Sequence, residues 1–222
     1  IAANTSSINL ATAILIAPLR SPALLAKTAA SLDAISNGRV ELGVGLGWQE
    51  EEYEASGIPF DQRVKTFWET LDICQSLWTG GPVSHKGEIF EFNDIWCHPT
   101  PPQGSDIPLL FGVKMTEFNA QKIAKIGHGW IPIKTSRDFI SEGSEKLNHA
   151  FKEAGRDDKP RIRGQLPTCV DSNGVPSVEL TLKELEKSME AGLEEIEVFP
   201  INFAQSPDHL REVLELIGEL KK

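Results

Sequence analysis

Short apolar runs alternate with helix-like segments along the whole chain. Most of these runs are followed by residues with apolar side chains at helical spacing. A run without polar interruption, such as 9–17, is typical of a parallel strand covered on both faces. The alternation predicts an α/β fold whose parallel strands are joined by right-handed helical crossovers. The strand-like runs are 9–17, 40–45, 107–113, 130–133, 161–170 and 196–199.

The number of strand–helix units leaves two architectures open. An open doubly wound sheet and a (β/α) barrel share this alternation, and a barrel typically needs eight units in about 250 residues. The chain has 222 residues and six strand-like runs, so as a barrel it is two units short. A hairpin at 83–92, turning at Lys86-Gly87, interrupts the alternation. The pattern therefore predicts a parallel sheet with one antiparallel excursion.

Helix-terminal signals locate several of the helices. Ser21-Pro22 predicts an N-cap followed by proline at the first helical position, and Asn37-Gly38 predicts the end of the same helix. Asp61 predicts the N-cap of the helix before the hairpin. Thr181-x-x-Glu184 has the pattern of a capping box, and Ser206-Pro207 predicts the start of a last helix.

Composition excludes several classes of protein. The net charge is −10, which argues against general binding to nucleic acid or to anionic membranes. No stretch approaches the roughly 18 apolar residues of a membrane span, and we expect no secretory leader, because the chain shows no basic start followed by an apolar core. The cysteines are odd in number and far apart, and the five histidines lack metal-ligand spacing. We therefore expect a cytoplasmic protein without a disulfide framework or a metal site.

Glycines close the second strand-like run in the sequence GRVELGVGLGW. Gly43-x-Gly45 could open a dinucleotide-binding fingerprint, but the third glycine of that motif would fall at 48, where Trp48 stands. A Walker A sequence does not occur either. Gly45 and Gly47 instead lie where a parallel strand ends, the edge at which α/β folds bind ligands. They either let a flat ligand ring approach the backbone, with Trp48 as a wall, or serve only a tight turn.

Other polar residues have a structural interpretation beside a functional one. The run of glutamates at 50–54 could include a general base, although a solvated helical turn is the commoner outcome for such a run. His128 is either a polar group near a pocket or a hydrogen-bonded structural residue. Asp33 and Arg39, near the start of a strand, fit a structural role. The carboxylates in question are Glu50, Glu51, Glu52 and Glu54.

Longer segments of the chain resemble the bacterial luciferase-like monooxygenase family, and most closely its coenzyme F420-dependent oxidoreductase branch. The similarity is carried in order by four segments: LATAILIAPLRSPALLAKTAASLDAISNGRVELGVGLGWQEEEYEASGIPFDQR, DICQSLWTGGPVSHKGEIF, PTPPQGSDIPLLFG and IGHGWIPI. The resemblance implies a (β/α)8 barrel as a single domain over 1–222, with an insertion at about 80–106. It makes 9–17 the third barrel strand and places the first two strands before Ile1, so the expected fold is an incomplete barrel of strands 3–8.

The resemblance also implies a cofactor site built from three regions. In many relatives a non-proline cis peptide lies beneath the flavin-type ring in the region that corresponds to 12–14, although an ordinary buried strand is the alternative there. The loop 45–48 resembles the segment beside the ring. The segment 112–115 would bind a phosphate at a helix N-terminus, with Val113 where relatives carry a second glycine. The expected cofactor-binding residues are Thr12, Ala13, Ile14, Gly45, Gly47, Trp48, Gly112, Val113, Lys114 and Met115.

The activity that the resemblance implies is hydride transfer between bound F420 and a small organic substrate. An FMN-dependent monooxygenase is the alternative within the family. Catalytic residues are not identified, because in relatives they come largely from the early strands. A non-catalytic relative that binds a ligand or partner is the alternative outside enzymes. Unpaired strand edges recruit other chains, so a homodimer is expected, with contacts at those edges or at the hairpin.

Overall fold

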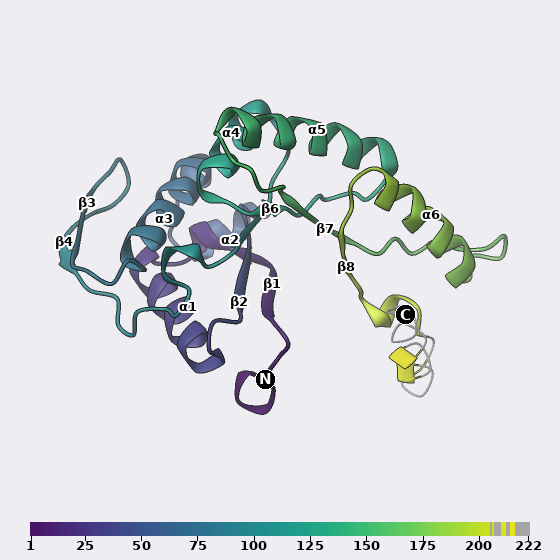
Figure 1. Ribbon diagram of the computed structural model, residues 1–222, viewed down its shortest axis with the longest axis horizontal. Helices are drawn as coiled ribbons and strands as arrows, with labels where there is room; N and C mark the ends of the chain where they lie inside the picture. Colours follow the sequence, from purple (N-terminus) through teal and green to yellow (C-terminus); the bar gives the residue numbers. More distant parts are fainter. Residues whose placement is uncertain (205, 207–209, 212–213, 216–222) are drawn as a thin grey trace. The chain divides into compact units, whose positions relative to one another are not determined.

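The computed structural model describes residues 1–204, 206, 210–211 and 214–215, and it confirms the α/β alternation (Figure 1). Of the helix expected from Ser206-Pro207 onward, the structure describes Ser206 and residues 210, 211, 214 and 215, and the last four are helical. The chain forms two compact units. Unit 1 comprises residues 1–113 with 126–128, and unit 2 comprises 114–125 with the residues from 129 onward. Within the part of the chain that is described, no helix has both the length and the apolar character to cross a bilayer.

Unit 1 contains three parallel strands in the order β1-β2-β5. Every residue of β2 is buried, as expected for a strand between two neighbours in an α/β sheet. The strands are β1 (Leu10–Ile16), β2 (Val40–Gly45) and β5 (Leu109–Gly112), and the helices are α1 (Pro22–Ser36), α2 (Glu50–Ala55) and α3 (Arg63–Leu77).

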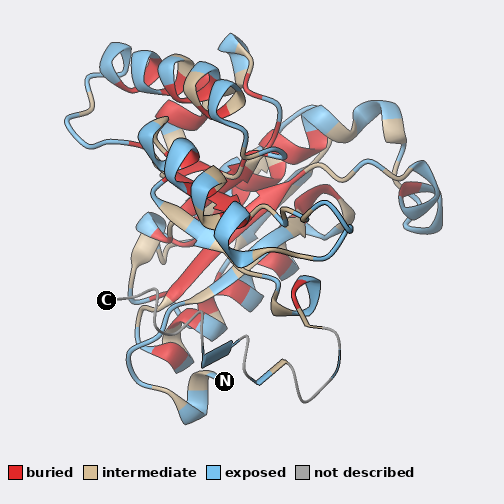
Figure 2. Cartoon of the chain, turned by 90° about the vertical axis from the view of Figure 1, so that its right-hand side faces the viewer, coloured by how far each residue is buried: buried red, intermediate tan, exposed pale blue. Residues whose placement is uncertain are grey.

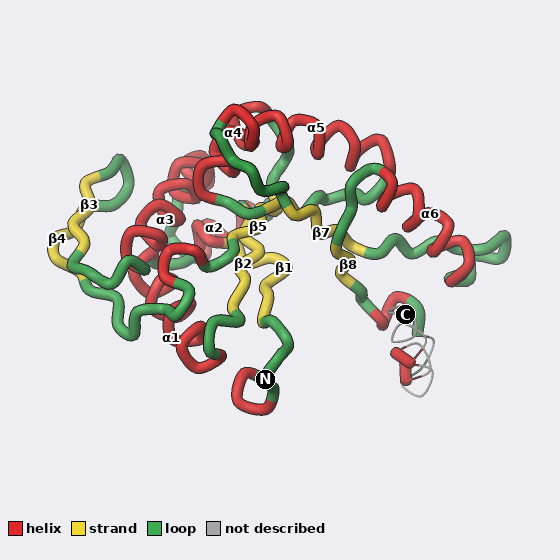
Figure 3. The backbone as a smooth tube through the Cα atoms, in the orientation of Figure 1, coloured by secondary structure: helices red, strands yellow, loops and turns green. Residues whose placement is uncertain are grey.

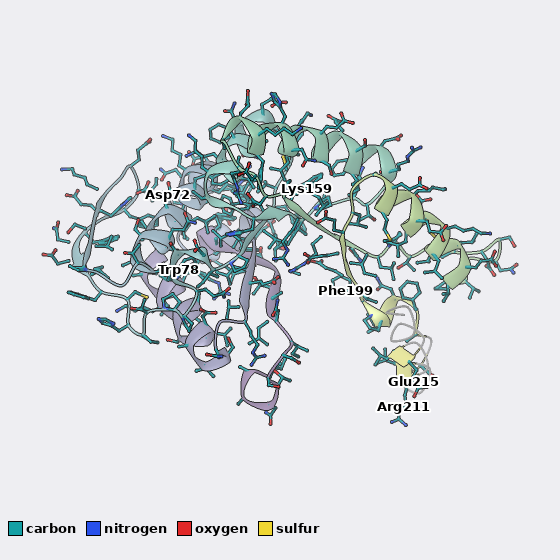
Figure 4. All side chains as sticks on the ribbon, in the orientation of Figure 1. Asp72, Trp78, Lys159, Phe199, Arg211 and Glu215 are labelled. Atoms are coloured by element: carbon teal, nitrogen blue, oxygen red, sulfur yellow. The ribbon has the colours of Figure 1, made fainter. Side chains whose placement is uncertain are left out.

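Aromatic side chains fill the core of unit 1. The rings of Trp68 and Phe111 stack with their centroids 5.3 Å apart, and Phe67 meets Trp68 edge-on at 5.0 Å. Trp78, labelled in Figure 4, is fully buried, and its indole N–H donates to the Ala26 carbonyl at 3.0 Å. This bond satisfies the polar atom of the side chain while α3 packs against α1.

The prediction that the first strand is covered on both faces is wrong. Ala11 and Ala13 of β1 are exposed, and Ile14 is 38% exposed. Among the described strands β1 pairs only with β2. An apolar run predicts the strand correctly, but the coverage of each face depends on neighbours that the run does not specify.

Two structural residues hold the start of β2. Asp33 is fully buried and accepts hydrogen bonds from the Val40 N–H and from both the backbone and side-chain N–H groups of Gln103. The guanidinium of Arg39 donates to the carbonyls of Thr5 and Ile8. The structural role expected for both residues is confirmed, because their side chains hold the segments before β1, β2 and β5 by hydrogen bonds.

The antiparallel excursion consists of β3 (Val83–Lys86) and β4 (Glu91–Ile95), which extend beyond the helices of unit 1 (Figures 1 and 3). Glu69 of α3 anchors it by accepting hydrogen bonds from the N–H groups of Phe90 at 2.8 Å and Ile89 at 3.1 Å. His85 Nε2 lies 3.0 Å from the same carboxylate. Burial by itself would raise the pKa of Glu69, but these bonds outweigh it and the pKa lies below its ordinary value.

Unit 2 contains three further parallel strands in the order β6-β7-β8. These strands are shorter than the sequence predicts, and the expected strand at 161–170 ends at Gln165. Helices of both units carry a buried stripe on one face and exposed residues on the other (Figure 2). The strands are β6 (Gly129–Trp130), β7 (Arg161–Gln165) and β8 (Glu195–Glu197), and the helices are α4 (Glu117–Ile126), α5 (Arg137–Glu153) and α6 (Val178–Glu190).

Two of the predicted helix starts are wrong. Helix α6 begins at Val178, and its N-cap is Ser177, whose hydroxyl accepts from the Leu180 N–H at 3.3 Å. Thr181 is buried inside the helix and accepts from the Cys169 N–H, so it does not form a capping box. Asp61 lies in a 3-10 turn that precedes α3. Helix α6 is thus capped by a nearby serine, Ser177, and α3 begins after a short 3-10 turn.

Candidate cofactor site

The side chain of Ile14 is seated on two glycines at the carboxyl ends of neighbouring strands. A Cβ on Gly45 would lie well under 3.0 Å from Ile14 Cδ1, and a Cβ on Gly112 would lie 3.0 Å from the same atom. Gly45 pairs with Gly112 across β2 and β5, and β1 runs parallel beside β2. The two bare backbones therefore leave room for a side chain that is 38% exposed, which presents an apolar surface at this end of the sheet.

The backbone around Ile14 departs from a regular strand. The peptide bond between Ala13 and Ile14 is cis, which confirms the non-proline cis peptide that the resemblance implies. The pairing register of β1 against β2 shifts between Thr12 and Leu15. The Thr12 hydroxyl donates to the Gly43 carbonyl at 2.8 Å and so ties the segment to β2. The alternative of an ordinary buried strand is wrong for this segment.

The loop after β2 is held by contacts with Ile16 and Tyr53, and it carries an exposed tryptophan. Gly47 has a φ of 71°, and a Cβ there would lie 3.0 Å from Ile16 Cγ2. The buried Tyr53 of α2 donates its hydroxyl to the Leu46 carbonyl, and burial raises the pKa of this phenol. Trp48 is 85% exposed. Its ring therefore lies at the surface of unit 1 and does not form the wall of a pocket within that unit.

The segment between β5 and α4 alternates between buried and exposed side chains. Val113 and Met115 are buried, whereas Lys114 is exposed. The hydroxyl of Thr116 accepts from the Asn119 N–H at 3.2 Å, and the Asn119 side chain donates to the Lys114 carbonyl at 2.8 Å. The strand-to-helix junction expected at 112–116 is therefore present, with Thr116 capping the start of α4.

A pocket of about 420 Å³ opens beside the start of α4 within unit 2. Its wall includes Lys114, Thr116 and the buried ring of Trp130, together with an ion pair between Lys146 and Glu142 of α5. Lys146 Nζ lies 2.6 Å from Glu142 Oε1, and this hydrogen bond lowers the pKa of Glu142. Lys114 adds a second positive charge that acts in the same direction. The pocket thus combines a helix N-terminus with two lysines and with two carboxylates, those of Glu117 and Glu142.

Other candidates from the sequence do not join these groups. His128 Nδ1 accepts from the Leu109 N–H at 3.2 Å, at the start of β5 and away from Gly112 at its end. The interpretation of His128 as a polar group near the pocket is therefore wrong. The four carboxylates at 50–54 are all exposed on α2, as a solvated turn requires. In the described ranges, no cluster of three His, Cys, Asp or Glu side chains is placed to bind a metal ion.

Unit 2 has a charged sheet face that the sequence pattern did not reveal. Glu195 of β8 accepts from Arg161 Nε at 2.5 Å and from Arg163 Nε at 2.7 Å. Burial would raise the pKa of Glu195, but the two guanidinium groups hold it below its ordinary value. Glu197, two residues on, has a raised pKa because of burial, and its Oε1 has no hydrogen-bond partner among the described residues. Period-two spacing of charges in 161–165 and 195–197 was the available signal.

The parallel strands and their helical crossovers define an incomplete (β/α) barrel, with the Ile14 side chain at the carboxyl ends of its strands. The sequence profile of the family described as "Luciferase-like monooxygenase" matches residues 1–182, so the chain belongs to the luciferase-like monooxygenase family. An uncharacterised protein of Mycobacterium tuberculosis is 40% identical over 159 residues, which cover 71% of this chain and 55% of that protein. The chain thus spans about half the length of these curated relatives.

Solved structures show the same fold at low sequence identity. The coenzyme F420-dependent tetrahydromethanopterin reductase from Methanopyrus kandleri has a TM-score of 0.75 and 18% identity, covering 96% of this chain and 82% of that one. The oxygenating constituent of 3,6-diketocamphane monooxygenase from Pseudomonas putida, in complex with FMN, has a TM-score of 0.65 and 21% identity, covering 77% of this chain and 51% of that one. The predicted fold class, an incomplete luciferase-like barrel with six of its strands, is confirmed.

Proposed function

We propose that this chain binds a flavin-type cofactor, F420 in the first instance, and serves hydride transfer between that cofactor and a small organic substrate. The seated side chain of Ile14 carries the proposal. It is apolar, partly exposed, and fixed by Gly45 and Gly112 at the carboxyl ends of parallel strands, the edge where barrel enzymes of this type act. A planar ring with apolar faces fits against such a surface.

Each group of residues has a separate task in this proposal. Thr12 and Ala13 hold the backbone beneath the ring, and the loop 45–48 lies beside it with Trp48 available as a further aromatic contact. The segment 112–115 leads into the N-terminus of α4, where the positive end of the helix dipole and Lys114 suit a phosphate. The bound cofactor supplies the hydride chemistry, and the residues of the chain bind and orient it.

The choice of F420 over FMN rests on likeness of fold. The M. kandleri reductase, described as F420-dependent, matches 96% of the chain with a TM-score of 0.75. An FMN-dependent monooxygenase is the second candidate, and the likeness to the P. putida enzyme in complex with FMN supports it. The two candidates differ in the cofactor that binds more tightly and in whether oxygen is consumed.

Cofactor titration tests the proposal directly. Purified protein is titrated with F420 and, separately, with FMN, and cofactor fluorescence reports binding. Ile14→Ala removes most of the apolar surface, so we expect the dissociation constant to rise about tenfold, the equivalent of roughly 1.4 kcal/mol of lost contact. Ile8→Ala is the matched control, because Ile8 is 52% exposed and precedes β1 at its amino end, outside the candidate site. Absence of binding by either cofactor below about 1 mM would overturn the proposal.

We also propose that the protein is a homodimer. Helix α1 exposes Leu24 and Ile35, which are 65% and 67% accessible, and β1 has an unpaired edge among the described strands. Light scattering measures the mass in solution. A stable monomer of 24.4 kDa at high protein concentration would contradict the dimer without affecting the cofactor site.

A further inference from the structure

A second pocket, of about 410 Å³, lies in unit 2 between α5, the end of α6 and the start of β7. None of the residues that line it belongs to the candidate cofactor site. It opens near Pro160 and Ile162, at the amino end of β7, whereas ligands of α/β sheets bind at the carboxyl ends. The pocket therefore needs an explanation of its own.

The electrostatics of this pocket favour a positively charged ligand. Three carboxylates line it, from Glu145, Glu190 and Glu194, against one ammonium group from Lys159, which Figure 4 labels. Helix α6 ends at Glu190, so the negative end of its dipole also adjoins the pocket. The carboxylates do not gather into a group of three that could hold a metal ion, according to the described residues. An organic cation needs no such group of three ligands, because each of its N–H groups can contact a single carboxylate.

A buried hydroxyl in the pocket wall lacks a partner. Ser144 is only 7% exposed, and its Oγ makes no hydrogen bond to any residue that the structure describes. A helical serine commonly donates to the carbonyl four residues earlier, and an unpaired buried hydroxyl is unfavourable. A Cβ on Gly192 would lie 3.3 Å from this Oγ, so the glycine keeps the space beside the hydroxyl open. The wall thus presents an unused hydrogen-bonding group beside the carboxylates.

We propose that this pocket, bounded by Ser144, Glu145, Glu190 and Glu194, binds a small organic cation that carries a primary ammonium group. An ammonium has three N–H donors, which match two carboxylates and the lone pairs of the Ser144 hydroxyl. The pocket volume suits a molecule of a few carbon atoms. The site acts independently of the cofactor, so it stands or falls separately from the proposed function.

The probe for this site is 1,4-diaminobutane, with 1,4-butanediol as an uncharged control of the same length. Binding is measured by calorimetry and by the change in melting temperature on the whole chain without added cofactor. The double variant Glu190→Gln/Glu194→Gln should weaken diamine binding about tenfold, because it removes two charge-assisted hydrogen bonds. The control double variant Glu179→Gln/Glu186→Gln removes the same charge from α6 outside the pocket and should bind as the wild type does.

A second variant tests the hydroxyl. Ser144→Ala removes no hydrogen bond that the described structure shows, so the melting temperature of the free protein should not fall. The same variant should weaken diamine binding several-fold and reduce the stabilisation that the diamine gives. The proposal is overturned if the diol binds as well as the diamine, if the diamine does not bind below about 10 mM, or if the control double variant loses as much affinity as the pocket variant.

Discussion

Replacing Gly45 with alanine tests whether the Ile14 side chain packs directly against the bare backbone of Gly45. The new Cβ would lie well under 3.0 Å from Ile14 Cδ1, where a normal carbon contact is about 3.5–4.0 Å, and 3.0 Å from the Gly112 carbonyl oxygen. The Ile14 side chain must leave its rotamer, at a cost of about 0.5–1.5 kcal/mol, while the backbone oxygen cannot retreat. We expect the free energy of unfolding to fall by about 1–2 kcal/mol.

A double-mutant cycle assigns that loss to the contact between residues 14 and 45. Ile14→Val deletes Cδ1 and leaves Cγ1 at 3.4 Å from the Cβ that alanine would place at position 45, which is an ordinary contact. In the valine background Gly45→Ala should therefore cost only about 0.5 kcal/mol, a coupling of about 1 kcal/mol between the two positions.

Urea unfolding, followed by the fluorescence of the buried Trp68 and Trp78 of unit 1, measures these values. Gly81→Ala is the control, because Gly81 has no heavy atom within 4 Å of a new Cβ and does not adopt the left-handed conformation. The reasoning about the seat is refuted if Gly45→Ala is no more costly than Gly81→Ala, or if the coupling with position 14 is absent.

Two further predictions follow from the hairpin and from unit 2. Burial opposes ionisation of Glu69, but bonds from Phe90, His85 and Ile89 keep its pKa below the ordinary 4.5. The ionised Glu69 carboxylate therefore stabilises the hairpin fully above pH 4.5, and this stabilisation is lost as the pH falls through the lowered pKa. We expect hydrogen exchange of the Ile89 and Phe90 amides to become faster in that acidic range. Glu69→Gln should abolish this pH dependence of amide exchange, and the control Glu88→Gln should keep it. The same pH dependence in Glu69→Gln would contradict the assignment to Glu69. Gly143→Ala places a Cβ under 3.0 Å from the buried Trp130 ring, so overpacking of about 3 kcal/mol, less about 1 kcal/mol of helix propensity, should destabilise the protein by about 2 kcal/mol in thermal unfolding. Undiminished stability of Gly143→Ala would show that the ring can move.

Strand positions and the α/β class were predictable because both depend on local apolar patterns. The hairpin at Lys86-Gly87 and the helix end at Asn37-Gly38 were predictable because turns and helix ends have their own local sequence signals, such as glycine in the left-handed region at Gly38. Helix starts near Asp61 and Thr181 were not, because Ser177 and a 3-10 turn compete for the same termini. Local patterns rank such competitors poorly when they lie within a few residues of each other.

The cofactor site stays a prediction, and the contacts that its residues make in the structure could not be predicted from the sequence. Gly45 was expected to admit a ligand ring, whereas in the structure its bare face admits the Ile14 side chain. This contact joins neighbouring strands and depends on the register shift in β1, which no local pattern encodes. Tyr53 was missed, although one aromatic residue among the carboxylates at 50–54 is the kind of signal that marks the buried side of a short helix.

The anchoring of the hairpin by Glu69 decides where a reporter group can be attached to this protein. The tip at Gly87 is an obvious place for a dye or an epitope, yet any side chain there would collide with the Glu69 carboxylate and with His85. Gly81, just before β3, has open space around it and an unstrained backbone. Labels and inserted peptides belong at Gly81, where they leave the excursion fastened to α3.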